Sequence, residues 1–165
     1  MQMVDKEPTI RPAEVADAPA ITDCVTRAYE HYLPRLGRKP GPMLEDYARV
    51  IAEREVYVAE RGDEVVGVLV LGRGDDGFCL YNVAVRPEQR GRGIGRGLLN
   101  LAEVRAADAG FNAIYLYTHE KMVENRALYV RLGYVQYDER TADGMTRVFM
   151  RKSLERANVF DCSQR

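Results

Sequence analysis

The stretch "RPEQRGRGIGRG", Arg86 to Gly97, joins two segments of different periodicity. The apolar run before it, "FCLYNVAV" (Phe78 to Val85), predicts a β-strand. After it, apolar residues recur at helical spacing and Gly110 ends the pattern. The residues that share this helical face are Ile94, Leu98, Leu101 and Ala102. The stretch is therefore predicted to be a glycine-rich turn that leads from a strand into a helix.

A turn of this kind suits a bound diphosphate. The first N–H groups of a helix have no partner within the helix, and the helix dipole adds partial positive charge there. Glycines let an anion approach the backbone closely, and Arg90, Arg92 and Arg96 add charge. These features favour a diphosphate site, although a solvated turn at a helix start carries similar residues.

Other nucleotide-binding loops fit the sequence less well. A P-loop needs GxxxxGK followed by Ser or Thr, and the chain has no lysine from Arg86 to Arg105. The string "GRGDDG", Gly72 to Gly77, has GxGxxG spacing but leads into a strand and carries two aspartates that would repel phosphate. We therefore interpret it as a plain loop.

The rest of the chain predicts strands and helices in the order βααβββαβαββ. Asp17 is expected to cap the first helix, whose apolar face contains Ile21, Cys24, Val25, Ala28 and Tyr32. The segment 33–42 is expected to be a loop, and a short helix follows it. The strands are expected at 9–12, 55–60, 64–72, 78–85, 113–118, 134–140 and 146–152. This order favours an α/β or α+β fold with one mixed sheet.

Composition indicates one ordinary globular domain. The 165 residues are 46% hydrophobic and 30% charged, with a formal net charge of −1. We expect one domain over 1–154 and a loose C-terminal tail over 155–165. Near-zero net charge argues against a nucleic-acid partner, and the glycine-rich stretch lacks the aromatic residues on which bases stack.

Several further features bear on location and metal binding. The longest apolar run, Val65 to Gly72, is too short to cross a bilayer, and the N-terminus has no secretory signal. Three widely spaced cysteines are typical of reduced thiols in a cytoplasmic protein; they are Cys24, Cys79 and Cys162. His31 and His119 lack ligand-like spacing, so no metal site is expected.

The longer segment "VAVRPEQRGRGIGRGLL" (Val83 to Leu99) resembles the acetyl-coenzyme A signature of the GNAT superfamily of N-acetyltransferases. That signature is Arg or Gln, two residues, Gly, one residue, then Gly or Ala; Arg90, Gly93 and Gly95 fill it. A second segment, "ENRALYVRLGY" (Glu124 to Tyr134), is similar to a late helix of the family. The resemblance covers about residues 80 to 135 and implies a mixed, mostly antiparallel central sheet flanked by helices.

The resemblance also implies where the co-substrate acetyl-CoA lies, namely between strands 78–85 and 113–118 where they separate. The pantetheine arm would bond to the backbone of Val83 and Val85, and the Val83 N–H would polarise the thioester carbonyl. Asn125 would bond the same arm, and Tyr129 would protonate the leaving thiolate. The pyrophosphate would rest on the N–H groups of Gly91, Gly93, Gly95 and Arg96, with Arg90 in the same signature.

The acceptor side is less well defined. An attacking amine has a pKa of about 10.4 when free, so a base is needed at neutral pH. Glu120, just past a strand end, is the best placed carboxylate, although a solvated loop glutamate is an equally good interpretation; Tyr81 and His119 are weaker candidates for this base. Substrate contacts are expected from the first two helices and their loop, and from Tyr81. The residues there are Tyr29, His31, Tyr32 and Arg35, of which Tyr32 also continues a core-facing stripe.

These observations predict an acetyl-CoA-dependent N-acetyltransferase that moves an acetyl group to a primary amine by direct attack on the thioester. The alternative is a non-catalytic acyl-CoA-binding or regulatory domain on the same fold. The acceptor could be a small-molecule amine or a peptide amine, with no membrane partner expected. The sequence leaves the oligomeric state open, a homodimer included.

Overall fold

The computed structural model describes residues 6–154, so the expected tail at 155–165 and Cys162 lie outside the described residues. The helices are α1 (Ala18–Tyr29), α2 (Leu33–Leu36), α3 (Tyr47–Glu53), α4 (Ile94–Asp108) and α5 (Val123–Arg131). The strands are β1 (Thr9–Pro12), β2 (Glu55–Arg61), β3 (Glu64–Gly74), β4 (Gly77–Val85), β5 (Ala113–His119), β6 (Val135–Ala142) and β7 (Met145–Ser153). Apart from the four-residue α2, this is the predicted order.

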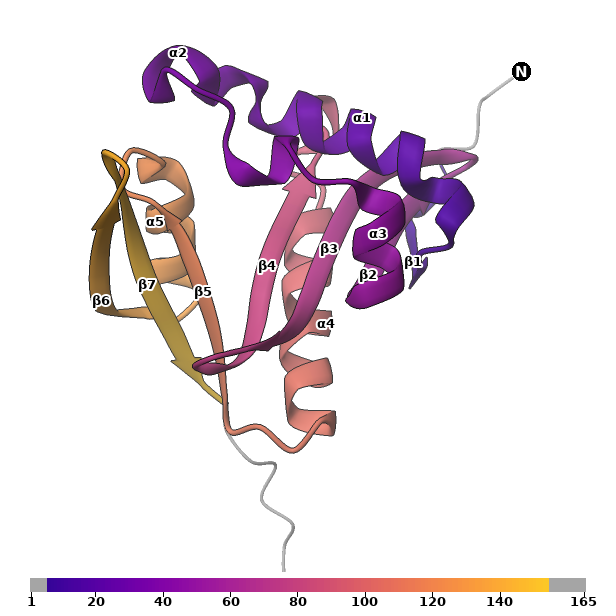
Figure 1. Cartoon of the computed structure of the whole chain (residues 1–165). Coiled ribbons are helices and arrows are strands. Elements are labelled where there is room, and N and C mark those ends of the chain that lie inside the picture. The colour runs from indigo at the N-terminus through magenta and orange to yellow at the C-terminus, as the bar shows by residue number, and fades with distance from the viewer. Residues whose placement is uncertain (1–5, 155–165) are drawn as a thin grey trace, which may run out of the picture.

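The strands described form one sheet in the order β1-β2-β3-β4-β5-β7-β6 (Figure 1). Every neighbouring pair is antiparallel except β4 and β5, which are parallel. The expected mixed, mostly antiparallel sheet flanked by helices is confirmed. Only Asp75 and Asp76 of the string "GRGDDG" form the tight turn between β3 and β4, because β3 extends to Gly74 and β4 begins at Gly77.

Helices cover both faces of the sheet. The apolar stripe of α1 and the short α3 pack on one face of β2, β3 and β4. Helices α4 and α5 pack on the opposite face, against side chains of β3, β4, β5 and β7. The β3 residues 65–71 are buried throughout, because this strand is covered on both faces. All five residues of the stripe predicted for the first helix are buried, although Tyr32 lies just beyond the end of α1.

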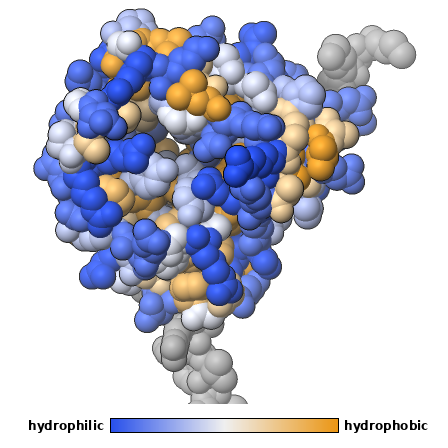
Figure 2. All heavy atoms as spheres, in the orientation of Figure 1, coloured by the Kyte–Doolittle hydropathy of each residue, from blue (hydrophilic) through white to orange (hydrophobic). Residues whose placement is uncertain are grey.

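The two parallel strands pair over a very short distance. Their register contains only Cys79 with Tyr115 and Leu80 with Leu116. On the other edge of β4, Asn82 pairs with Val70 and Leu80 with Leu71 of β3, so Tyr81 between them forms a bulge. Beyond Leu80 the two strands separate, as Figure 1 shows. The space-filling view shows a hollow on this face of the molecule (Figure 2). The predicted separation of these two strands is confirmed.

Local chemistry differs from the sequence prediction at three places. Asp17 does not cap α1 with its side chain, because its carboxylate accepts two hydrogen bonds from Arg11 and one from the Glu14 N–H. The expected loop 33–42 contains the one-turn helix α2, which Gly37 ends with a φ of 72°. The next helix begins only at Tyr47, after the capping residue Asp46, and leaves Leu44 exposed.

Candidate active site

The glycine-rich turn has the left-handed backbone that only glycine adopts easily. Gly91 and Gly93 have φ values of 75° and 82°, and Gly93 is the residue from which α4 begins. A Cβ atom added at either position would meet no atom of the protein within 4 Å. The turn therefore exposes bare backbone to open space at the N-terminus of a 15-residue helix.

A cavity of about 820 Å³ lies beside this turn, and we call it the cofactor cavity. Its walls come from α1, β4, the turn, α4 and α5, and the separated strands open onto it. It brings together all nine residues that the resemblance placed around acetyl-CoA. These are Val83, Val85, Arg90, Gly91, Gly93, Gly95, Arg96, Asn125 and Tyr129.

The arginines of the turn have different positions. The Arg90 guanidinium donates to the Ala28 carbonyl oxygen at 3.0 Å, which ties the turn to the C-terminal end of α1. Arg96, in the first turn of α4, lines the cofactor cavity. Arg90 thus holds the turn in place, while Arg96 adds positive charge next to the exposed N–H groups.

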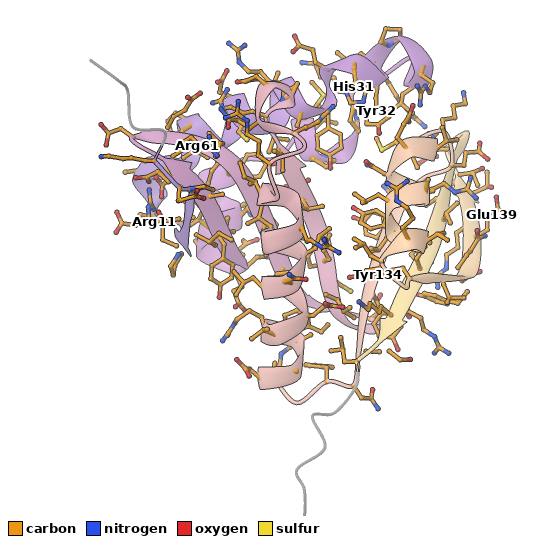
Figure 3. All side chains as sticks on the ribbon, turned by 180° about the vertical axis from the view of Figure 1, so that it is seen from behind. Arg11, His31, Tyr32, Arg61, Tyr134 and Glu139 are labelled. Carbon is orange, nitrogen blue, oxygen red and sulfur yellow. The ribbon has the colours of Figure 1, made fainter. Side chains whose placement is uncertain are left out.

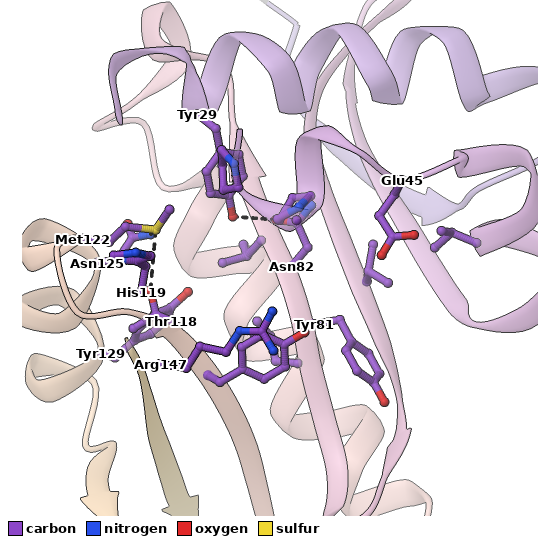
Figure 4. Close-up of a pocket in the computed structure, with 18 of the residues that line it drawn as sticks. Tyr29, Glu45, Tyr81, Asn82, Thr118, His119, Met122, Asn125, Tyr129 and Arg147 are labelled. Atoms are coloured by element: carbon purple, nitrogen blue, oxygen red, sulfur yellow. Dashed lines mark hydrogen bonds between the residues drawn. The ribbon is translucent and has the colours of Figure 1, made fainter. Parts of the chain in front are cut away.

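A second cavity of about 110 Å³ lies on the α3 side of the separated strands, and we call it the front cavity (Figure 4). Four residues line both cavities: Tyr29, Val83, Asn125 and Tyr129. The two cavities therefore meet at the point where β4 and β5 have separated. A ligand in one cavity can reach a ligand in the other beside the backbone of Val83.

Tyr129 lies at this meeting point with a free hydroxyl group. Its side chain is only 6% exposed, and the ring packs edge-on against Tyr134 at 5.6 Å between centroids. Within residues 6–154 its hydroxyl has no hydrogen-bond partner. Burial raises the pKa of Tyr129 well above that of a free phenol, so the hydroxyl carries its proton at neutral pH.

Asn125 lies one turn before Tyr129 on α5 and connects the helix to the N-terminal region. Its side-chain oxygen accepts a hydrogen bond from the Tyr32 hydroxyl at 3.3 Å. Figure 3 shows Tyr32 in the segment between α1 and α2, on the side that faces α5. Tyr32 is buried and lines the cofactor cavity but not the front cavity, so the structure places it with the cofactor residues.

A buried chain of hydrogen bonds fixes β4 beside Val83, and sequence reasoning missed it. The Tyr29 hydroxyl donates to the Asn82 side-chain oxygen at 2.7 Å, and the Asn82 amide donates to the Tyr47 hydroxyl at 3.3 Å. Tyr47 in turn donates to the Pro42 carbonyl oxygen at 2.5 Å. The available signal was Asn82 itself, a polar residue within an otherwise apolar strand.

The remaining predicted acceptor residues are dispersed. Tyr29 and Tyr81 line the front cavity, whereas Arg35 and Glu120 line neither cavity. Arg35 instead pairs with Glu124 at 2.7 Å, and this contact lowers the pKa of the Glu124 carboxyl to about 2. The Glu120 N–H donates to the Thr146 carbonyl oxygen, and the Glu120 carbonyl accepts from Arg126.

Two groups in the front cavity are relevant to proton transfer. His119 accepts a hydrogen bond at Nδ1 from the Lys121 N–H at 3.0 Å, and burial lowers the pKa of the imidazole. The neutral ring therefore carries its proton on Nε2 and has no free lone pair for an amine proton. Glu45, which the sequence did not suggest, is the acidic residue of the front cavity, and Figure 4 shows its carboxylate pointing into it.

No cluster of three or more metal-ligating side chains occurs among residues 6–154. No helix in the described part of the chain is long and apolar enough to span a membrane. Cys24 and Cys79 are free thiols, and burial raises the pKa of the Cys24 thiol to about 12.

Comparison with known proteins shows the family to which this chain belongs. Residues 20–134, more than half of the chain, match the acetyltransferase (GNAT) family. The chain belongs to this family.

Solved structures of several acetyltransferases have the same fold as this chain. The PaiA N-acetyltransferase of Thermoplasma acidophilum, in complex with coenzyme A, has a TM-score of 0.72 at 18% identity, covering 89% of this chain and 99% of that one. The ribosomal-protein-S18-alanine N-acetyltransferase of Escherichia coli has a TM-score of 0.72 at 20% identity, covering 93% and 98%. A GNAT acetyltransferase of Elizabethkingia anophelis with acetyl-CoA bound has a TM-score of 0.68 at 20% identity, covering 89% and 98%.

Proposed function

We propose that this protein is an acetyl-CoA-dependent N-acetyltransferase that acetylates a primary amine by direct attack on the thioester. The observation that carries the proposal is the meeting of two cavities beside Val83, between Asn125 and Tyr129. A cavity for the acyl donor and a cavity for the acceptor must share one point if the acetyl group passes directly between them. Membership of the acetyltransferase family supports the same conclusion.

Donor binding would use the backbone of the cofactor cavity. The pyrophosphate of acetyl-CoA would accept hydrogen bonds from the N–H groups of Gly91, Gly93, Gly95 and Arg96, where no Cβ blocks its approach at Gly91 and Gly93. The pantetheine arm would lie along Val83 and Val85 on the edge of β4 that has no strand partner beyond Leu80 in the described chain. Asn125 would fix the arm from the opposite side.

In the acyl-transfer step, the neutral amine nitrogen attacks the thioester carbon and forms a tetrahedral intermediate. The Val83 N–H would stabilise the negative charge that develops on the carbonyl oxygen. The intermediate collapses by breaking the carbon–sulfur bond. Tyr129 would donate its proton to the departing sulfur, because its buried phenol is protonated and Tyr129 lines both cavities where they meet. The nitrogen, which carries a positive charge after the attack, releases one proton, and the Tyr129 phenolate regains a proton, so the products are an N-acetylated amine and free coenzyme A.

An acceptor that arrives as an ammonium ion must lose a further proton before it can attack, and Glu45 is our candidate to receive that proton. It is the acidic side chain in the front cavity, whereas Glu120 lies outside both cavities. Because Glu45 is exposed, the proton can pass to bulk water afterwards. Glu45→Gln would then lower kcat/KM most strongly below the pKa of the acceptor amine, where that amine is mainly protonated.

A turnover screen tests the proposal. The protein is incubated with acetyl-CoA and a panel of primary amines, thiol release is followed continuously, and each product is identified by its mass. We expect amine-dependent thiol release with an added acetyl group on at least one acceptor. Tight binding of acetyl-CoA without amine-dependent release for any acceptor would instead favour the non-catalytic acyl-CoA-binding alternative.

A further inference from the structure

The front cavity carries two arginines mounted on aromatic rings. The Arg54 guanidinium lies 3.8 Å from the ring centroid of Tyr81, and the Arg147 guanidinium lies 5.1 Å from that of Tyr117. All four residues line the cavity. Figure 4 shows Arg147 and Glu45 entering it from opposite sides. The two guanidinium groups come from elements far apart in sequence, the end of α3 and strand β7.

Neither of these arginines has an acidic partner within residues 6–154. Other arginines of the protein are paired: Arg35 with Glu124, Arg105 with Glu55, and Arg140 with Asp138. Stacking holds a guanidinium in place while its N–H groups remain free to bond an anion. The front cavity therefore contains two positioned cationic groups whose hydrogen bonds the protein itself does not use.

The charge of the cavity selects between kinds of amine. Arg54 and Arg147 carry two positive charges, Glu45 carries one negative charge, and burial keeps His119 neutral near pH 7. An acceptor that arrives as an ammonium ion brings another positive charge. A purely cationic acceptor would thus enter a site that is already positive, whereas an acceptor with its own anionic group would be neutralised there.

We propose that the acceptor belongs to the amino-acid class, a primary amine that carries a carboxylate a few bonds away. The carboxylate binds Arg147 and Arg54 through paired N–H donors, a geometry that suits planar guanidinium and carboxylate groups. Arg147 is exposed at the mouth of the cavity, so the carboxylate lies outward and the amine points inward to Val83. The small volume of about 110 Å³ suits a compact acceptor. This inference rests on the proposed acetyltransferase function.

Matched sets of acceptors test it. For several amino acids, the free acid, its amide and the corresponding decarboxylated amine are compared by kcat/KM for amine-dependent thiol release. An α-amine beside a neutral carbonyl has a pKa of about 7.7–8.0, lower than other amines, so reactivity alone favours the amide. We expect the free acid to be preferred over both relatives by about tenfold or more, the scale of one charge-assisted hydrogen bond.

Arg147→Gln and Arg54→Gln should each reduce this preference by about tenfold, mainly through the KM of the acid, and leave the acetyl-CoA Kd unchanged. Arg140→Gln is the matched control, because Arg140 also lies over an aromatic ring, Phe149 at 4.2 Å, but lines neither cavity. It should leave the preference intact.

The outcomes separate the two levels of the proposal. Turnover that favours amides or simple amines, or a preference for acids that survives both arginine substitutions, would overturn the inference while the acetyltransferase function stands. Absence of amine-dependent turnover with every member of the sets and of the wider panel would overturn the proposed function, and the inference with it.

Discussion

The cofactor cavity and the front cavity are built in different ways. The first consists mainly of backbone: two left-handed glycines, a helix N-terminus and the free edge of a strand. The second consists mainly of side chains, which come from α1, the loop before α3, α3 itself, β3, β4, β5, α5 and β7. Backbone sites follow from a local sequence pattern, whereas side-chain sites depend on which distant segments the fold brings together. The predictions below test this contrast, beginning with the largest expected effect.

Gly93→Val should abolish acetyl-CoA binding while the protein remains folded. The new side chain occupies space that is open in the cavity, and its Cβ disfavours the φ of 82° at the start of α4. Isothermal titration measures the loss. Gly110→Val is the control, since Gly110 has a φ of 88° and open space around it at the other end of the same helix.

Both substitutions should cost about 1–2 kcal/mol of folding stability from backbone strain. Only the change at Gly93 should alter the acetyl-CoA Kd. Equal loss of affinity in the two variants would mean that strain alone explains the effect and that the turn is not the pyrophosphate site.

Tyr129→Phe should lower kcat about 100-fold with little change in acetyl-CoA affinity, because it removes only the hydroxyl that would protonate the thiolate. Steady-state kinetics with chemistry shown to be rate-limiting provide the measurement. Tyr134→Phe is the matched control: Tyr134 is equally buried beside Tyr129, its hydroxyl has no partner among the described residues, and it lines neither cavity. Near wild-type kcat for Tyr129→Phe would exclude it as the proton donor.

Asn82→Ala should destabilise the fold by about 1–3 kcal/mol, since it leaves the buried Tyr29 hydroxyl without an acceptor. Chemical denaturation measures this change in the free energy of unfolding. The double variant with Tyr29→Phe should lose less than the sum of the two single variants, because both remove the same hydrogen bond. If the two changes in unfolding free energy were strictly additive, the Tyr29–Asn82 hydrogen bond would contribute nothing to the stability of β4 beside Val83.

Arg35→Ala should have the smallest effect, a slight fall in melting temperature with unchanged KM for the amine. The Glu124 pKa is lowered by Arg35, so their pair stabilises the folded state above pH 4.5 and loses that effect as the pH falls toward 2. The difference in melting temperature between wild type and variant should therefore be larger at pH 6 than at pH 3. A raised amine KM would instead place Arg35 in the acceptor site.

Most of the fold could be predicted from local sequence patterns, whereas the residues expected around the cofactor came from the resemblance of two segments to the GNAT family. Each strand and long helix follows from local periodicity, and the strand–glycine turn–helix unit defines its own geometry. Asp17 shows a limit of this reasoning. Its carboxylate binds Arg11 of β1 and therefore does not accept a hydrogen bond from the first turn of α1.

The front cavity could not be predicted in the same way. Glu45, in the loop before α3, and Arg147, on β7, line the same cavity only because the fold brings together segments that are far apart in the sequence. Neither residue belongs to a motif. Arg35 and Glu120 have suitable chemistry, yet Arg35 forms a salt bridge with Glu124, and Glu120 lines neither cavity.

The two residue pairs that join β4 to β5 have a thermodynamic consequence. The sheet consists of a four-stranded part and a three-stranded part, connected by this short ladder and by α4, which contacts strands of both parts. A donor molecule bound along β4 would act as an additional strand and couple the two parts. Saturation at 100 times Kd would add about 2.7 kcal/mol to the free energy of unfolding. The amide hydrogens of Val83 and Val85 would then exchange with solvent more slowly. The two parts of the sheet would unfold together more often as the concentration of acetyl-CoA rises.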